Sequence, residues 1–321
     1  MIKKKIIIVF FILFIGFIVL FTGSVKIDFK SVFDQTQANI IFWKIRLPRL
    51  FLAFIVGAVL SLSGFIFQNL FKNELATPFT LGVSSGAAAG AVISIKFNLV
   101  FSVLGLNSVQ LFGFVGAILT IGFIIFVAKS LKNFSIYTLL MTGIAINFFA
   151  SSVILFSQYI FDFSQTISVL RWLMGSLETF GLKDVLIVLP FFLILIVVVF
   201  MFKREILFLS ANDEFASSKG IDVEKFRTMI FVLVSLIIGV VVSITGPIGF
   251  IGLIIPHISR ILFKLKLKSM ILFNILAGGL FLIITDYISR ILINSVQIPV
   301  GIITSLFGAP FFLYILISKS K

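Results

Sequence analysis

Few side chains in this sequence could carry chemistry, and three arginines near the ends of apolar runs are candidates for binding a carboxylate. Arg46 and Arg49 frame an Arg-Leu-Pro-Arg sequence, and Arg290 follows Asp286 by four residues. A guanidinium group binds a carboxylate through two parallel hydrogen bonds, which suits an oriented and reversible contact with a partner. Alternatively, these arginines extend toward the lipid–water interface, or Arg290 pairs with Asp286 one helical turn away.

Residues for catalysis or metal binding are scarce. His257 is the only histidine and cysteine is absent, so a metal site lacks ligands and thiol chemistry is excluded. The sequence has no G-x-x-x-x-G-K-[ST] loop and therefore does not bind ATP in the P-loop manner. We predict no catalytic residue, no metal site, no cofactor and no enzymatic activity, and we interpret Pro256, His257 and Arg260 as a gating region in a broken helix.

The composition is that of a membrane protein. Of 321 residues, 60% are hydrophobic and only 12% are charged, which is far from the proportions of soluble domains. The net charge of +14 does not indicate nucleic-acid binding, because the lysines and arginines fall mainly in the short breaks between apolar runs.

Ten apolar runs are candidates for membrane spans, since a helix needs about 20 apolar residues to cross a hydrocarbon layer of about 30 Å. With both termini in the cytoplasm, ten spans place 16 lysines and arginines inside and 9 outside, the expected sense. The first run resembles a signal peptide but lacks a good cleavage site, so we expect a retained helix. The sequence predicts an all-α, multi-pass protein of the plasma (inner) membrane, with residues 1–321 forming a single transmembrane domain. The predicted spans are 5–22, 49–71, 79–96, 108–128, 136–160, 184–202, 228–247, 249–263, 270–293 and 300–317.

A polar stretch separates the sixth and seventh runs. Its pattern predicts two short helices, 211–219 and 223–227, that meet at Gly220. We interpret residues 205–227 as a cytoplasmic docking element, with a solvated linker as the alternative.

An internal repeat is indicated by two similar segments, 57–64 and 239–246, which share one pattern of small and branched residues. In the ten-span topology they cross the membrane in opposite directions, as in the inverted repeats of many transporters. Independent selection of small residues for close helix packing is the alternative.

Three longer motifs resemble the FecCD family of permeases, which import iron(III) siderophores, haem and vitamin B12. They are Arg46-Leu-Pro-Arg49 with the following segments 73–78 and 81–86, then residues 246–260, and then Asp286 and Arg290 with residues 299–311. The resemblance covers about residues 40–317. It implies a ten-helix, inverted-repeat permease of the type II ABC importer fold. The implied partners are a second permease, identical or paralogous, a cytoplasmic ABC ATPase dimer, an extracytoplasmic substrate-binding protein and a metal chelate, with no nucleic acid.

The resemblance also assigns roles to residues. Arg46, Arg49 and Arg290 match the arginines that dock the binding protein, and Asp213, Glu214, Ala216 and Gly220 match the ATPase-coupling helices. Here Ala211-Asn212 replaces the usual Leu-Gly pair, which puts exchange with other ATPases of the family in doubt. Candidates for the translocation pathway are Gly64, Gln68, Ser84, Ser85 and Gly86, together with Pro256, His257 and Arg260.

We therefore predict the permease subunit of an ABC importer for an iron(III)-siderophore, with haem or cobalamin as alternative substrates. An ion-coupled secondary transporter, from a different class, would also have many spans and an inverted repeat. It would need an acidic residue within the membrane to carry the ion, and Asp286 is the clear candidate.

Overall fold

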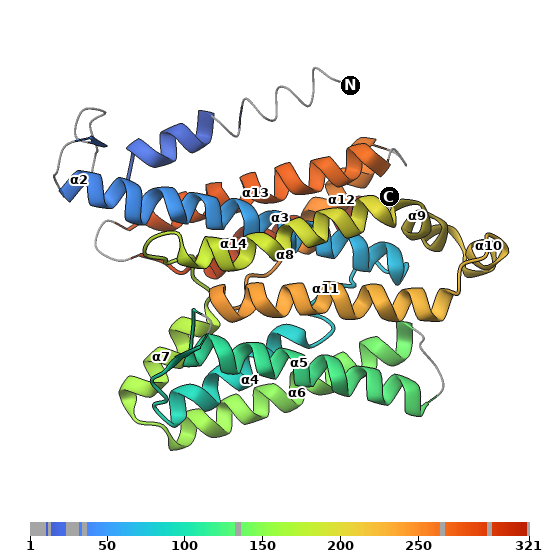
Figure 1. The fold of residues 1–321 in the computed structure, drawn as a ribbon, viewed down its shortest axis with the longest axis horizontal. Coiled ribbons are helices and arrows are strands. Elements are labelled where there is room, and N and C mark those ends of the chain that lie inside the picture. Colours follow the sequence, from blue (N-terminus) through green and yellow to red (C-terminus); the bar gives the residue numbers. More distant parts are fainter. Residues whose placement is uncertain are drawn as a thin grey trace. The chain divides into compact units, whose positions relative to one another are not determined.

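The computed structural model describes residues 11, 14–23, 32–33, 37–103, 105–131, 136–263, 267–293 and 297–319, and helices dominate this part (Figure 1). The short strands β1 (Ser102–Val103) and β2 (Leu106–Asn107) form an antiparallel hairpin that pairs Ser102 with Asn107 and Val103 with Leu106. The helices are α2 (Gln37–Ile40), the π-helix η2 (Ile41–Arg46), α3 (Leu47–Leu70), α4 (Val83–Lys96), α5 (Ser108–Ser130), α6 (Ile136–Ile160), α7 (Phe163–Leu173), α8 (Lys183–Met201), α9 (Lys203–Ala211), α10 (Asp213–Ser218), α11 (Val223–Thr245), α12 (Ile251–Phe263), α13 (Leu267–Ile291) and α14 (Val300–Lys319).

The predicted spans correspond to observed helices. In the described part, six stretches are long and apolar enough to cross a membrane, namely Gln37–Leu70 and α5, α6, α8, α11 and α13, and α4, α12 and α14 contribute shorter apolar helices. Residues 14–21 of the first predicted span are helical, and most of its remainder lies outside the described residues, as do Lys3–Lys5 and Lys321 at the termini. The prediction of an all-α, polytopic membrane protein is confirmed.

The second span begins earlier than expected. The sequence predicts a span over 49–71, whereas the helical stretch starts at Gln37 and runs through η2 into α3. Pro48 has no N–H with which to bond the carbonyl of Lys44 four residues earlier. The N–H of Gly181 donates to that carbonyl at 2.7 Å, so the helix continues through the proline with its backbone satisfied.

The chain forms two compact units. Unit 1 comprises residues 1–62, 175–192 and 248–321, and unit 2 comprises residues 63–174 and 193–247. Unit 1 therefore holds α12, α13, α14 and the first part of α3, and unit 2 holds α4, α5, α6 and α11.

Glycines bring helices into close contact within each unit. In unit 1, a Cβ atom on Gly57 of α3 would collide with the carbonyl oxygen of Gly278 in α13. In unit 2, a Cβ atom on Gly86 of α4 would collide with Thr120 and with the carbonyl of Gly116 in α5. Small residues of this kind let helices approach closely in a membrane, where apolar side chains gain little from facing each other rather than lipid.

The internal repeat is visible in the packing of the two units. Helices α4, α5 and α6 pack against one another in unit 2, and α12, α13 and α14 do so in unit 1. The first repeated segment packs through Gly57 on α13, the middle helix of its triplet, and the second packs through Gly239 on Ala117 of α5, the middle helix of the other. Because the two similar segments contact equivalent helices, the packing favours a true repeat over independent selection of small residues.

Candidate functional site

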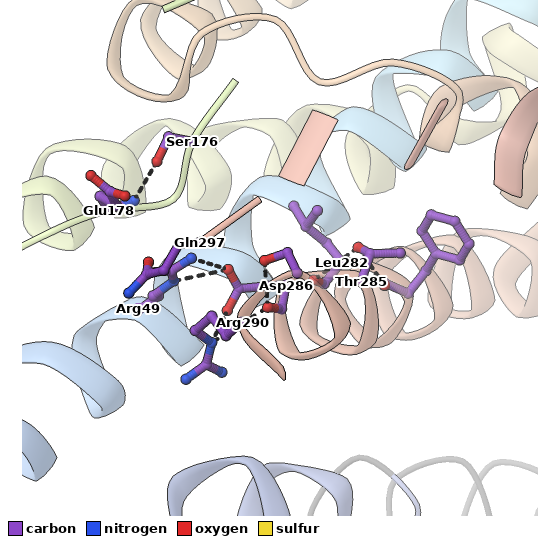
Figure 2. A network of polar contacts seen from close by, with 10 residues as sticks. Arg49, Ser176, Glu178, Leu282, Thr285, Asp286, Arg290 and Gln297 are labelled. Carbon is purple, nitrogen blue, oxygen red and sulfur yellow. Dashed lines mark hydrogen bonds and ion pairs between the residues drawn. The ribbon is translucent and has the colours of Figure 1, made fainter. Parts of the chain in front are cut away.

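Arg49 and Arg290 meet at one buried carboxylate in unit 1. Nε and Nη2 of Arg49 both lie 2.8 Å from Oδ1 of Asp286, and Nε of Arg290 lies 3.2 Å from its Oδ2 (Figure 2). The Asp286 side chain is 2% exposed. Helix α3 supplies Arg49 near its start and α13 supplies Asp286 and Arg290 near its end, so two helices close this cluster.

Gln297, which we did not predict, completes the surroundings of Arg49. Its Oε1 accepts a hydrogen bond from Nη1 of Arg49 at 3.0 Å. A glutamine 248 residues away from Arg49 gives no signal in the sequence. The Arg290–Asp286 spacing, in contrast, was a visible helical pair, and that alternative for Arg290 is observed.

Arg46 lies in the same unit but has different neighbours. Its Nη1 donates to the carbonyl oxygen of Leu20 at 2.8 Å, and Arg46 as a whole is 5% exposed. Arg49 and Arg290 carry two positive charges, and the carboxylate between them is that of Asp286. The Arg49–Asp286–Arg290 group thus has one positive charge more than its own carboxylate neutralises.

Asp213 anchors the polar segment between α8 and α11 within unit 2. It accepts a hydrogen bond from Nζ of Lys72 at 2.6 Å and two from Nη2 of Arg227 at 3.0 and 3.1 Å. Burial by itself raises the pKa of Asp213, but the hydrogen bonds from Lys72 and Arg227 outweigh burial and hold the pKa below its ordinary value. Lys72 follows α3 and has a left-handed backbone with φ of 49°, a conformation that is costly for a non-glycine residue. The Lys72–Asp213–Arg227 triad ties α10 to the end of α3 and to α11.

The remaining coupling candidates have distinct positions on and after α10. Ala216 is fully buried and fixes one face of the helix, whereas Glu214 and Phe215 are exposed on it. Gly220 has a φ of +80° and makes the predicted break. The first predicted short helix is present as α10, but the second is wrong, because residues 223–227 are the first turns of α11 with Asp222 as the N-cap. Helix α9 (Lys203–Ala211) was not predicted.

The pathway candidates of unit 2 are mostly engaged in packing. Gln68 and Ser84 are buried, as is Gly64, and Gly86 forms the tight contact with α5. Ser85 hydrogen-bonds Oδ1 of Asn147 in α6 at 2.6 Å, and Asn147 was not predicted.

The pathway candidates of unit 1 lie along α12. Pro256 and His257 are buried inside this helix, and Arg260 is half-buried. At 13 residues, α12 is about 20 Å long and shorter than the hydrocarbon layer, as its broken pattern suggested. In the part of the chain that the structure describes, no group of three or more His, Cys, Asp or Glu residues could hold a metal ion.

A buried polar chain next to these residues links three helices. Oγ of Ser61 in α3 donates to Oδ1 of Asn274 in α13 at 3.0 Å, and Nδ2 of Asn274 donates to Oγ of Ser259 in α12 at 3.0 Å. Ser259 in turn donates to the carbonyl of Pro256 at 2.8 Å. All three linking side chains are fully buried, so Asn274 is a polar junction for these helices.

Known proteins resemble this chain over most of its length. The model of the FecCD transport family matches residues 9–318. An ABC transporter permease, YvrB, of Bacillus subtilis (strain 168) is 36% identical over 94% of this chain and 84% of its own length. An iron chelatin transport system permease of Helicobacter pylori (strain 26695) is 35% identical over 91% of this chain and 87% of its own.

Solved structures resemble the chain as well. A metal-chelate type ABC transporter in an inward-facing conformation superposes with a TM-score of 0.85 at 29% identity, covering 98% of both chains. Further relatives that match over at least 74% of their own length are named for hemin transport in Yersinia pestis, cobalamin import in Halobacterium salinarum and molybdate import in Haemophilus influenzae.

Proposed function

The chain belongs to the FecCD transport family, and from this membership we propose that it carries an iron(III)-siderophore through the membrane. Members of the family are multi-pass membrane permeases of ABC importers for metal chelates, and a separate ATPase subunit hydrolyses the ATP. The observation that supports the proposal most is the family match over residues 9–318, together with a solved metal-chelate transporter of nearly the same extent. Haem and cobalamin are the alternative cargoes, because relatives named for each share at least 33% of the aligned residues.

An ion-coupled secondary transporter is disfavoured by the surroundings of Asp286. A carboxylate that carries a coupling ion must be able to exchange that ion. Asp286 instead has an arginine on each of its two oxygens, and both arginines come from the same compact unit.

We assign the partners to two surfaces. The arginine cluster of Arg46, Arg49 and Arg290 is the docking site for an acidic surface of an extracytoplasmic substrate-binding protein, because Arg49 and Arg290 together carry one positive charge more than Asp286 neutralises. The segment around α10, with Asp213, Glu214, Ala216 and Gly220, is the docking site for the ATPase.

The remaining assignments complete the proposed assembly. A second permease, identical or paralogous, pairs with this chain. The two units of this chain act as one transmembrane domain in the inner membrane, with both termini in the cytoplasm. Within unit 2, the residues assigned to the translocation pathway are Gly64, Gln68, Ser84, Ser85 and Gly86. Within unit 1, those assigned to the gate are Pro256, His257 and Arg260.

Purification from the native host tests the class of transporter. We expect a tagged chain, extracted in mild detergent, to retain an ABC ATPase in a fixed ratio identified by mass spectrometry. Intact protein that repeatedly lacks any ATPase would contradict the importer.

Uptake tests the cargo in a deletion strain of the host that is complemented with this chain. Iron-55 bound to a siderophore should accumulate only with the intact chain, whereas labelled hemin and cobalamin should not depend on it. Dependence of hemin or cobalamin uptake, without that of iron, would replace the siderophore by that cargo.

A further inference from the structure

Arg49 and Arg290 differ in what they can still bind, although both belong to the proposed docking cluster. We propose that Arg49 does not contact the binding protein, and that Arg49, Asp286 and Gln297 are positioning residues that hold Arg290 for an incoming carboxylate. This inference rests on the docking role proposed above and divides that role among the residues of the cluster.

The protein already engages Arg49 at every nitrogen of its guanidinium group. Each of its three guanidinium nitrogens has an acceptor, since Nε and Nη2 reach Asp286 and Nη1 reaches Gln297, all within 3.0 Å. Its side chain is 7% exposed. A new carboxylate would have to displace Asp286, and a buried guanidinium gains little by exchanging one carboxylate for another.

Arg290 is held through Nε, whereas Nη1 and Nη2, its outer nitrogens, remain available for another hydrogen bond. Nε contacts Oδ2 of Asp286 at 3.2 Å and its carbonyl at 3.4 Å. Among the described residues, Nη1 and Nη2 of Arg290 have no hydrogen-bond partner, and Figure 2 shows them directed away from Asp286. These two nitrogens can still form a charge-assisted pair with a carboxylate.

The ring of Tyr287 gives Arg290 a second support. The Arg290 guanidinium carbon lies 5.9 Å from the ring centre, within the range of a cation–π contact. The Tyr287 hydroxyl is hydrogen-bonded to Thr22 at 2.8 Å, which fixes the ring from the opposite end. Arg290 is therefore held at Nε and across its face, with its outer nitrogens left for a partner.

The charge balance indicates the kind of ligand that the site accepts. One carboxylate lies between two guanidinium groups, so the Arg49–Asp286–Arg290 group carries a net positive charge in poorly solvated surroundings. A single aspartate or glutamate side chain of the partner would neutralise this charge at Arg290. A neutral or basic surface would leave it uncompensated.

Arginine-selective labelling tests the difference directly. The full complex in lipid nanodiscs is treated with phenylglyoxal, and labelling rates are measured for each arginine by peptide mass spectrometry, with exposed Arg171 as the internal standard. We expect Arg290 to be labelled at least about tenfold faster than Arg49, a ratio equal to about 1.4 kcal/mol. Equal rates, or a faster rate at Arg49, would overturn the proposal without any variant.

Variants then test whether Asp286 is the group that protects Arg49. Asp286→Asn should raise the labelling rate of Arg49 about tenfold. The matched control is Asp184→Asn, because Asp184 is also in unit 1 but accepts its hydrogen bond from Thr179, and it should leave Arg49 unchanged. If Asp286→Asn does not fold, Gln297→Ala removes only the acceptor of Nη1 and should raise the rate by a smaller factor. An unchanged rate in a folded variant counts against the proposal.

A double-mutant cycle tests positioning against direct contact. The readout is the concentration of binding protein that half-saturates ATP hydrolysis by the reconstituted complex. If Arg49 acts through Asp286, the double variant Arg49→Gln with Asp286→Asn should be no weaker than Asp286→Asn alone. Asp286→Glu, which keeps a carboxylate, should recover part of the loss, and the half-saturating concentration should change more than the maximal rate.

Two outcomes of the cycle would refute the inference. Effects that multiply would show that Arg49 contacts the partner independently of Asp286. If no binding protein stimulates ATP hydrolysis even with the wild-type complex, the docking function itself fails and the presenting role of Arg290 falls with it. The labelling ratio then still reports whether Arg49 is sequestered, so the two failures are distinguishable.

Discussion

Replacing Asp213 with asparagine should loosen α10 from the rest of unit 2. The Lys72–Asp213 pair is exposed by 34% and 44%, so its loss costs at most about 1 kcal/mol. Arg227 adds to this, because its side chain is 12% exposed and its Nε has no partner among the described residues. Weakening its bonds to Asp213 costs about another 1 kcal/mol. We therefore expect the free-energy cost of local opening to fall by about 1–2 kcal/mol, which raises the equilibrium constant for opening by a factor of about 5–30.

Hydrogen exchange with mass spectrometry measures this opening. Amide protons of residues 214–220 should exchange about 5–30 times faster in Asp213→Asn, in detergent or in nanodiscs. The matched control is Asp222→Asn, which loses an exposed ion pair with Lys225 but keeps a good N-cap for α11.

The comparison between the two variants decides the role of the triad. If Asp213→Asn exchanges no faster than Asp222→Asn, the ion triad does not hold α10. The burial of Ala216 would then account for its attachment.

Two further substitutions test the helix packing, and one pH titration tests the Asp213 triad again. Gly86→Val should destabilise the protein by about 1–3 kcal/mol through overpacking against α5, whereas Gly122→Ala, with open space around it, should not, as thermal unfolding in detergent will show. Asn274→Leu should cost about 0.6–1.7 kcal/mol in the same assay, because it breaks the polar junction of three helices. The pKa of Asp213 is lowered by folding, so its stabilisation is present above the ordinary value of 3.8 and lost as the pH falls through the lower value; exchange protection of α10, corrected for intrinsic rates, should fall in that window. Protection that stays constant there would contradict the ion triad.

Family and architecture were predictable from the sequence because both depend on local signals. A helix that crosses lipid must satisfy its backbone internally and needs a long apolar run, so the spans can be located one by one. The Arg46-Leu-Pro-Arg49 motif, residues 246–260 and the segment after Asp286 then indicated the family in the correct order. The ends of the elements were less accurate, and η2, α7 and α9 were not predicted, because short or irregular helices carry weak periodicity.

The contacts that give individual residues their roles depended on the tertiary structure. Arg49 and Asp286 are 237 residues apart, and Lys72 and Asp213 are 141 apart, so neither pairing leaves a periodic signal in the chain. The sequence by itself determined that arginines and an acidic segment lie at the ends of apolar helices. Only the packing of α3 against α13 decided that Arg49 has an acceptor at each guanidinium nitrogen while Arg290 contacts the Asp286 carboxylate through Nε, because burial and hydrogen bonding of this kind arise where distant segments meet.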